Sequence, residues 1–111
     1  MIPTPAYLLV LTTCPDEESA RTLAWGLVKD GLCACVSVVP GVRSYYRWKG
    51  ALEDAEELQL LIKTRADRYA DLEAAIRDRH PYEVPEVLAV PVHAGLGPYL
   101  AWIDESVSLP R

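Results

Sequence analysis

The sequence predicts a single α+β domain, and three observations support this. The chain has 111 residues, which is the usual size of one domain. Half of its residues are apolar and 24% are charged, a balance typical of globular rather than disordered proteins. Apolar patterns alternate along it in the order strand, helix, strand, strand, helix, strand. We therefore expect residues 1–111 to fold around one core.

The first strand and the first helix are predicted between residues 7 and 31. Residues 7–13 form a short apolar segment with strand character. Pro15 suits the first position of a helix, and the acidic residues at 16–18 complement the positive end of the helix dipole. An apolar stripe at helical spacing follows, and Gly31 is a suitable C-terminal cap. These features predict a helix that begins at Pro15 and ends at Gly31.

The next two strands are predicted to form a long hairpin. Residues 33–39 are rich in small and β-branched side chains, and Pro40-Gly41 interrupts them. The chain then continues extended to residue 48, Lys49-Gly50 makes the turn, and residues 56–64 return as the third strand. The tip of this hairpin carries Tyr45, Tyr46, Arg47 and Trp48.

The remaining elements are a helix, a strand and a short terminal helix. Thr64 with Asp67 is a modest N-cap signal, and apolar residues at 69, 72, 75 and 76 predict a helix that ends before Pro81. Residues 86–92 form a fourth strand, in which Pro91 fits only an edge or a strand end. Gly97-Pro98 begins the terminal helix. This order is the split βαβ arrangement of ferredoxin-like βαββαβ domains.

Both faces of the predicted sheet are apolar, which indicates self-association. In the first strand, Tyr7, Leu9 and Leu11 alternate with Leu8 and Val10. The two main helices of a ferredoxin-like domain cover one face, so the other face of a monomer should be polar. A second apolar face needs a second cover, and the terminal helix is too short to supply all of it. The aromatic hairpin tip is an expected contact, because Tyr, Trp and Arg are favoured at interfaces.

Charge and composition argue against several functions. A net charge of −5 is unfavourable for a nucleic-acid binder. No apolar run approaches the ~20 residues that cross a bilayer, and the first residues lack the charged and apolar regions of a signal peptide, so we expect a cytoplasmic protein. The three cysteines are expected to be reduced, because Cys33 and Cys35 point to opposite faces of a strand. No catalytic or cofactor-binding motif is present, so we expect neither an enzyme nor an organic cofactor.

Cys14 and His80 are the candidate metal ligands. Cys14 lies where a strand gives way to a helix, and backbone N–H groups there favour a thiolate; an inert thiol is the alternative. His80 precedes the stiff segment 81–86 and could help line a pocket, or it could simply interact with the end of its helix. There is no dense metal motif, so a site would be weak or shared between subunits. Thiol and imidazole donors suit copper or zinc better than magnesium.

Several motifs resemble the CutA family of divalent-cation tolerance proteins, in the family's order and spacing from about Leu8 to Ser106. The matching segments are Thr13–Ala20, Cys35 with Pro40-Gly41, Ser44–Gly50, Leu61–Thr64, His80–Glu86 and Tyr99–Trp102. The resemblance implies a ferredoxin-like subunit in a tight homotrimer that is similar to the PII signalling proteins. It also implies a role in tolerance of divalent metals, notably copper, and no established enzymatic reaction.

The copper ligands proposed for the bacterial family match this chain in part. The family's first-strand cysteine falls on Thr12, while a thiol stands two residues later at Cys14. The family's pair of histidines becomes Arg79-His80. His80 is thus carried over directly, and Cys14 is our own substitute for the missing thiol. We expect weak binding of Cu(II) or another divalent cation.

Two further hypotheses remain open. By analogy with PII, a cleft between subunits could bind a small anionic ligand through Trp48, Lys63, Tyr82 and Glu86. Lys63 would supply the positive charge, the two aromatic rings flat surfaces, and Glu86 a group for a metal or a donor. A purely structural role for all four residues is the competing interpretation. The third hypothesis is a trimeric scaffold that presents a surface to another protein.

Overall fold

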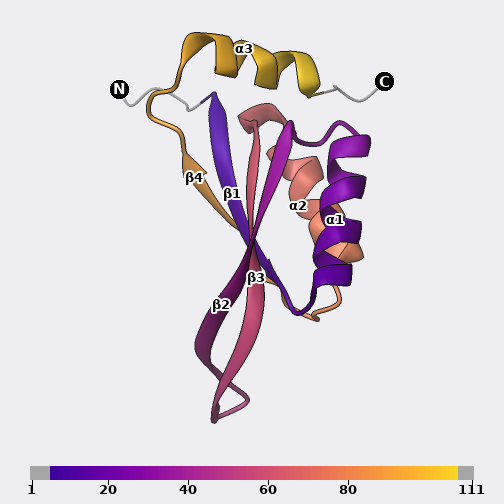
Figure 1. Ribbon diagram of the computed structural model, residues 1–111, viewed down its shortest axis with the longest axis vertical. Helices are drawn as coiled ribbons and strands as arrows, with labels where there is room; N and C mark the ends of the chain where they lie inside the picture. The colour runs from indigo at the N-terminus through magenta and orange to yellow at the C-terminus, as the bar shows by residue number, and fades with distance from the viewer. Residues whose placement is uncertain (1–5, 108–111) are drawn as a thin grey trace.

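The computed structural model describes residues 6–107 and confirms the α+β prediction. In chain order the elements are β1 (Tyr7–Cys14), α1 (Glu17–Lys29), β2 (Cys35–Trp48), β3 (Ala51–Arg65), the 3-10 turn η1 (Ala66–Arg68), α2 (Tyr69–Arg79), β4 (Leu88–Pro91) and α3 (Gly97–Ser106). The four strands form one antiparallel sheet in the order β2-β3-β1-β4. Helices α1 and α2 lie together on one face of that sheet (Figure 1).

The core lies between the sheet and these two helices. Strand side chains alternate between faces, so every second residue of β1 and β3 points toward the helices. Val10, Leu60 and Ile62 are fully buried there, and they pack with Leu27 of α1 and Leu72 of α2. Each such side chain contributes about 1.5–3 kcal/mol through burial, so this layer supplies most of the stability of the domain.

Both ends of α1 are capped by local sequence. The Asp16 carboxylate accepts a hydrogen bond from the Ser19 N–H at 2.7 Å, so the helix begins one residue later, at Glu17, and Pro15 lies before the cap. At the other end Gly31 has φ +70°, as the sequence predicts for a C-terminal cap. The N–H of Leu32 donates to the Leu27 carbonyl, which completes a Schellman motif.

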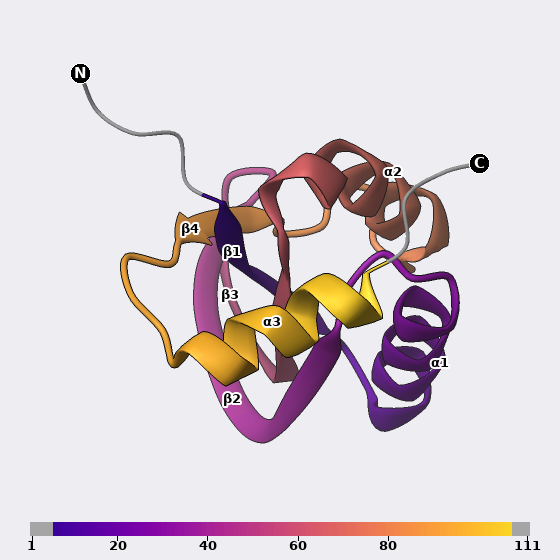
Figure 2. The same cartoon turned by 90° about the horizontal axis from the view of Figure 1, so that it is seen from above.

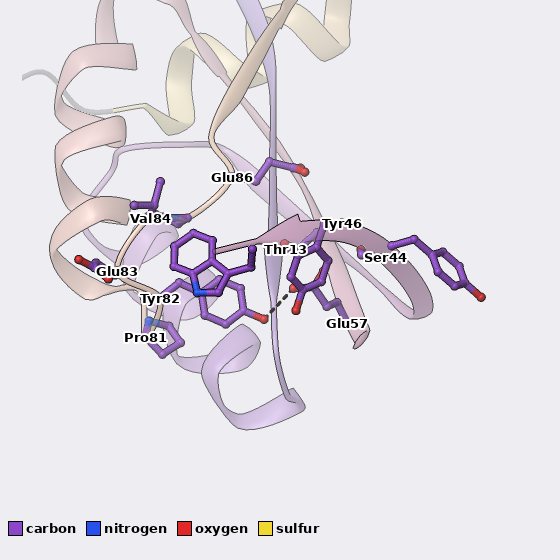
Figure 3. Close-up of a pocket in the computed structure, with 12 residues that line it drawn as sticks. Thr13, Ser44, Tyr46, Glu57, Pro81, Tyr82, Glu83, Val84 and Glu86 are labelled. Atoms are coloured by element: carbon purple, nitrogen blue, oxygen red, sulfur yellow. Dashed lines mark hydrogen bonds between the residues drawn. The ribbon is translucent and has the colours of Figure 1, made fainter. Parts of the chain in front are cut away.

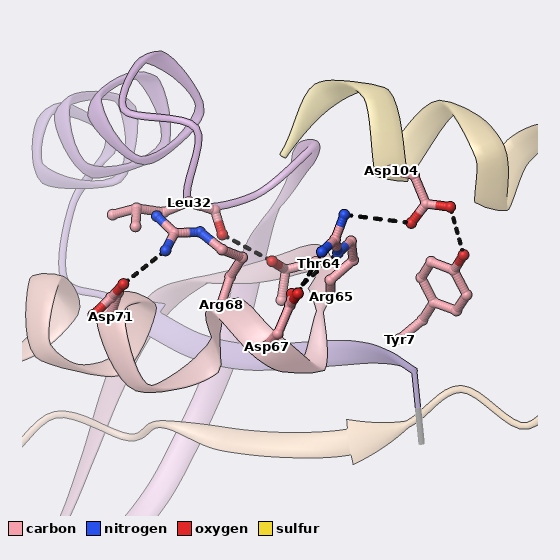
Figure 4. Close-up of polar contacts among 8 residues, drawn as sticks. All are labelled: Tyr7, Leu32, Thr64, Arg65, Asp67, Arg68, Asp71 and Asp104. Atoms are coloured by element: carbon pink, nitrogen blue, oxygen red, sulfur yellow. Dashed lines mark hydrogen bonds and ion pairs between the residues drawn. The ribbon is translucent and has the colours of Figure 1, made fainter. Parts of the chain in front are cut away.

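The predicted N-cap of α2 is wrong. Thr64 belongs to β3, which continues to Arg65 because that residue pairs with Tyr7 of β1. The Thr64 hydroxyl donates instead to the Leu32 carbonyl at 2.8 Å (Figure 4). Helix α2 follows the 3-10 turn and begins at Tyr69. Strand pairing has therefore taken priority over a local capping signal.

The β2–β3 hairpin is longer and more continuous than predicted. The third strand begins at Ala51 instead of residue 56, and the ladder pairs Trp48 with Ala51 next to the turn. Lys49 and Gly50 both have positive φ, which is the geometry of a tight two-residue hairpin turn. Pro40-Gly41 causes a bulge and not a break in β2. The outer half of the hairpin extends beyond the rest of the sheet (Figure 1).

Helix α3 lies across one end of the sheet (Figure 2). The Tyr7 hydroxyl donates to the Asp104 carboxylate at 2.9 Å, and Arg65 lies 3.9 Å from the same carboxylate (Figure 4). Ile103 and Val107 pack there against Ala34 in a second, small apolar cluster. The helix thus covers the end of the sheet and leaves its middle uncovered.

The face opposite α1 and α2 carries the apolar side chains of β1 and β4 that the sequence predicts. Leu9, Leu11 and Leu61 are half-buried on it. Leu88 and Val90 of β4 pair beside Leu11 and Leu9 and are 57% and 43% exposed. Strand β4 itself has only four residues, shorter than predicted, and Pro91 stands at its end. These exposed apolar side chains lie side by side on the open face, as in surfaces through which proteins associate.

Candidate functional site

A pocket of about 810 Å³ opens between the outer half of the β2–β3 hairpin and the loop that joins α2 to β4 (Figure 3). Its lining residues come from β1, both hairpin strands and the loop. They are Thr13, Ser44, Tyr45, Tyr46, Trp48, Glu57, Pro81, Tyr82, Glu83, Val84, Pro85 and Glu86. Binding pockets for small molecules have about this volume, commonly ~300–1,000 Å³.

The loop wall of the pocket is held in place by prolines and by one phenol. Pro81 and Pro85 restrict the backbone, and the residue before Pro81 is extended, which ends α2. Tyr82 then turns toward the sheet, where its hydroxyl donates to Oε2 of Glu57 at 2.7 Å (Figure 3). Burial, together with this hydrogen bond, raises the pKa of Tyr82. The loop is thereby tied to β3, and the phenol stays protonated.

His80 fixes the same loop from behind. Its Nε2 lies 2.6 Å from the Thr13 carbonyl, which can only accept, so Nε2 donates. Its Nδ1 accepts from the Tyr82 N–H at 3.0 Å. The imidazole is therefore the neutral tautomer with its proton on Nε2, and both nitrogens are engaged. His80 is only 7% exposed, and its ring lies beside the Tyr82 ring, with centroids 4.8 Å apart, so His80 supports the pocket wall without lining it.

Cys14 lies next to His80, as a common metal site would require, but it is not the thiolate considered from the sequence. Its Sγ is 3.9 Å from His80 Nε2. The side chain is fully buried at the end of β1, and this burial raises its pKa to about 11. Desolvation outweighs the Ser19 side-chain hydrogen bond, which lowers this pKa, so Cys14 is a neutral thiol at pH 7.

The Cys14–His80 pair offers one sulfur and one nitrogen donor. These donors suit copper or zinc. Within residues 6–107, no group of three or more His, Cys, Asp or Glu side chains is placed to hold a metal ion. A metal at this pair would also have to displace the thiol proton and the hydrogen bond to Thr13. The donors fit a weak site and not a tight one.

Three of the four predicted ligand residues line the pocket, and the fourth does not. Trp48, Tyr82 and Glu86 are in its wall. Lys63 lies elsewhere on the open face, where its Nζ donates to the Ser37 hydroxyl at 2.5 Å and lies 3.7 Å from Cys35 Sγ. Within one chain, the aromatic rings of Trp48 and Tyr82 are therefore separated from the positive charge of Lys63 that the sequence analysis grouped with them. The predicted cleft lay between subunits, so the set of four stays a prediction.

Glu57 is the pocket residue that the sequence analysis missed. It is only 6% exposed, although it carries a carboxylate. Its side chain shares the open face with Gln59 and Leu61 through strand alternation, and the hairpin register sets it opposite Val42. The available signal for a functional residue was a Glu on the same strand face as the apolar Leu61. Its contact with Tyr82, however, spans 25 positions of the sequence and depends on the fold.

Comparison with known proteins identifies the family. A family model described as CutA1 divalent ion tolerance protein matches residues 8–106. The chain belongs to this family. The divalent-cation tolerance protein CutA of Thermus thermophilus is 45% identical over 98 residues, which cover 88% of this chain and 95% of that protein. The crystal structure of CutA from Xylella fastidiosa superposes with a TM-score of 0.90 at 42% identity, covering 93% of this chain and 99% of that one.

The CutA1 assignment confirms both the resemblance and the fold predicted from the sequence. The family and this relative are both described as divalent-cation tolerance proteins. In the part of the chain that the structure describes, we find no helix of the length and apolarity needed to cross a membrane. A CutA structure from Archaeoglobus fulgidus, with a TM-score of 0.89 at 33% identity over 92% of this chain and 99% of that one, is described as periplasmic. The cytoplasmic location of this CutA1 chain therefore stays a prediction.

Proposed function

We propose that this CutA1-family chain serves divalent-cation tolerance in the cytoplasm as a homotrimer that binds Cu(II) or a similar ion weakly and catalyses no reaction. One observation supports the metal-binding part of this proposal. Cys14 Sγ lies 3.9 Å from His80 Nε2, although the two residues are 66 positions apart in the sequence. A thiol and an imidazole in contact form a donor pair of the kind that copper and zinc prefer. The family match supports the tolerance role.

The surroundings of this pair explain why binding should be weak. Cys14 must lose a proton from a thiol whose pKa is about 11, and His80 must release the Thr13 carbonyl. Both steps oppose metal binding at neutral pH, because only the thiolate and a free imidazole nitrogen are ligands. Uptake at this site therefore releases a proton and strengthens as pH rises.

Native mass spectrometry of the reduced protein, titrated with Cu(II) and with Zn(II), tests this proposal. We expect about one ion per subunit, which Cys14→Ser and His80→Ala abolish. Cys33→Ser is the matched control for a fully buried thiol, and His93→Ala is the control for an imidazole in an exposed residue. Uptake that is unchanged in both Cys14→Ser and His80→Ala would contradict metal binding at this pair.

A second candidate function is small-ligand binding, as in the PII comparison. The specific observation in its favour is the pocket of about 810 Å³ beside the hairpin. Its wall combines aromatic rings with a few polar groups, which is the usual composition of a ligand site. This function does not depend on the Cys14–His80 pair, because neither residue lines the pocket.

A further inference from the structure

We propose that the pocket between the hairpin and the α2–β4 loop binds a small organic cation of the alkylammonium class. This inference rests on the second candidate function, ligand binding, and adds the chemical class of the ligand. It differs from the anionic ligand considered from the sequence, whose predicted cleft lies between subunits. The charges, one buried carboxylate and the aromatic wall carry it.

The charges that line the pocket are all negative. Glu57, Glu83 and Glu86 are in its wall, and no Lys or Arg is among the lining residues. The ion pairs of residues 6–107 involve none of these three carboxylates. Like charges in a partly enclosed space raise the local concentration of cations and repel anions. As one chain forms it, the pocket is therefore unsuited to a phosphate or a carboxylic acid.

Glu57 is the strongest single indication that the ligand is a cation. The residue is only 6% exposed, and its Oε2 accepts a hydrogen bond from the neutral Tyr82 hydroxyl. A buried carboxylate is normally compensated by a cation, because its desolvation is costly. In the part of the chain that the structure describes, no cationic side chain forms an ion pair with it. A ligand cation in the adjoining pocket would supply the missing charge.

The aromatic wall defines the kind of cation. Tyr46 and Trp48 come from the hairpin and are both 42% exposed. Tyr82 comes from the loop, and Figure 3 labels it together with Tyr46. Aromatic faces attract cations, and sets of such rings recognise alkylated ammonium groups. The Trp48 ring already attracts one ammonium group in this structure, because Lys49 Nζ lies 5.8 Å from its centroid. Lys49 itself is outside the pocket lining.

A bare metal ion fits this pocket less well. The carboxylates do not form a group of three ligands within the described residues. The volume of about 810 Å³ is also far larger than one ion needs. Rings and spaced carboxylates in a wide pocket match a soft, bulky cation with an apolar surface, whose charge they can approach without direct coordination.

Isothermal titration calorimetry on the full-length protein tests the proposal with tetramethylammonium as the probe. Neopentyl alcohol is the neutral probe of similar shape, and oxalate is the anionic one. We expect saturable binding of tetramethylammonium, and binding of the other two probes at least tenfold more weakly. Glu57→Gln should weaken tetramethylammonium binding at least tenfold, since it removes the charge while keeping an acceptor for Tyr82.

Two variants keep this test decisive. Glu56→Gln is the matched control, because Glu56 is the exposed neighbour of Glu57 on the other face of β3 and should leave the affinity unchanged. Trp48→Leu should also weaken binding at least tenfold, and it serves if Glu57→Gln fails to fold. Equal effects of Glu56→Gln and Glu57→Gln would overturn the proposal. Binding of oxalate but not tetramethylammonium would overturn the cation class alone, whereas binding of no probe would overturn ligand binding itself.

Discussion

At the residue scale, burial decides the chemistry of the thiols. Cys14 and Cys33 are fully buried, and burial raises their pKa values to about 11 and about 12. Cys14 ends β1 two residues before the N-cap of α1, and the loss of water around it opposes the charge of a thiolate. Beside it, His80 uses both ring nitrogens to hold the backbone of Thr13 and Tyr82. Both side chains are therefore parts of the structural support as well as candidate ligands.

The raised thiol pKa values predict a loss of stability in alkali. An unfolded thiol with the ordinary value of 9.0 loses its proton from about pH 9, while the folded thiols keep theirs until about pH 11 or above. The unfolded state therefore binds fewer protons in this window, and the free energy of unfolding falls as pH rises, by up to about 1.4 kcal/mol per pH unit for each thiol. Urea unfolding of the reduced protein at a fixed concentration between pH 8 and pH 11 measures this slope.

Replacement of the two buried thiols isolates their share of the slope. The double variant Cys14→Ala, Cys33→Ala should show a clearly shallower decline with pH than the wild type. Val36→Ala is the control, because Val36 packs against the same core and carries no titratable group. A slope in the double variant equal to that of the wild type would contradict the role of these thiols.

At the scale of elements, a few side-chain hydrogen bonds hold the loop between α2 and β4 to the sheet. Tyr82 donates to Glu57 of β3, and His80 donates to the Thr13 carbonyl of β1 while it accepts from the Tyr82 N–H of the loop itself. The hairpin on the other side of the pocket is held by a continuous ladder to its turn. Any change in the shape of the pocket should therefore arise from the loop and not from the hairpin.

Tyr82→Phe should loosen this loop without unfolding the domain. The change removes the hydroxyl that donates to Glu57 and leaves that carboxylate without its phenol partner. We expect amide hydrogen exchange in residues 82–87 to become several-fold faster, while the exchange of β1 and β3 stays slow. Tyr69→Phe is the matched control, because it removes a similar phenol–carboxylate bond, to Glu73, within α2. Faster exchange across the whole sheet, or no change in the loop, would contradict this account.

At the scale of the whole molecule, the open face of the sheet is the feature that a single chain leaves incomplete. Leu9, Leu11 and Leu61 lie on it beside the exposed Leu88 and Val90. Helix α3 covers only one end of the sheet (Figure 2). Burial of such a face against other copies is the economical way to remove it from water, which is the physical basis of the proposed homotrimer.

Leu88→Glu should separate the proposed trimer into folded monomers. Leu88 is 57% exposed within one chain, so the substitution should change the stability of a subunit little, but a charge on a buried interface opposes assembly strongly. Native mass spectrometry should show three subunits for the wild type and one for the variant, with unchanged far-ultraviolet circular dichroism. Trp25→Glu is the control, since Trp25 is 75% exposed on α1, on the helix-covered side. A variant that remains trimeric would show that this face is not the interface.

Local sequence determined most of the elements of this protein. The apolar periods of α1 and α2, the Gly31 cap and the Lys49-Gly50 turn act over a few residues, so they could be recognised without the fold. The family resemblance also rests on short motifs that can be read without the fold, and the family match confirmed it. Local signals failed where a longer-range interaction competed with them, as at Thr64, which strand pairing with β1 draws into β3.

The candidate site was decided by the tertiary structure. Cys14 and His80 were recognisable as chemical types, but their contact, the protonation of the thiol and the engagement of both imidazole nitrogens depend on burial and on partners distant in the chain. In the same way, Glu57 became a pocket residue only when the hairpin register and the α2–β4 loop brought Tyr82 to it. Sequence determines which groups are present and on which face of an element they lie, whereas desolvation and charge compensation depend on what the folded chain places around them.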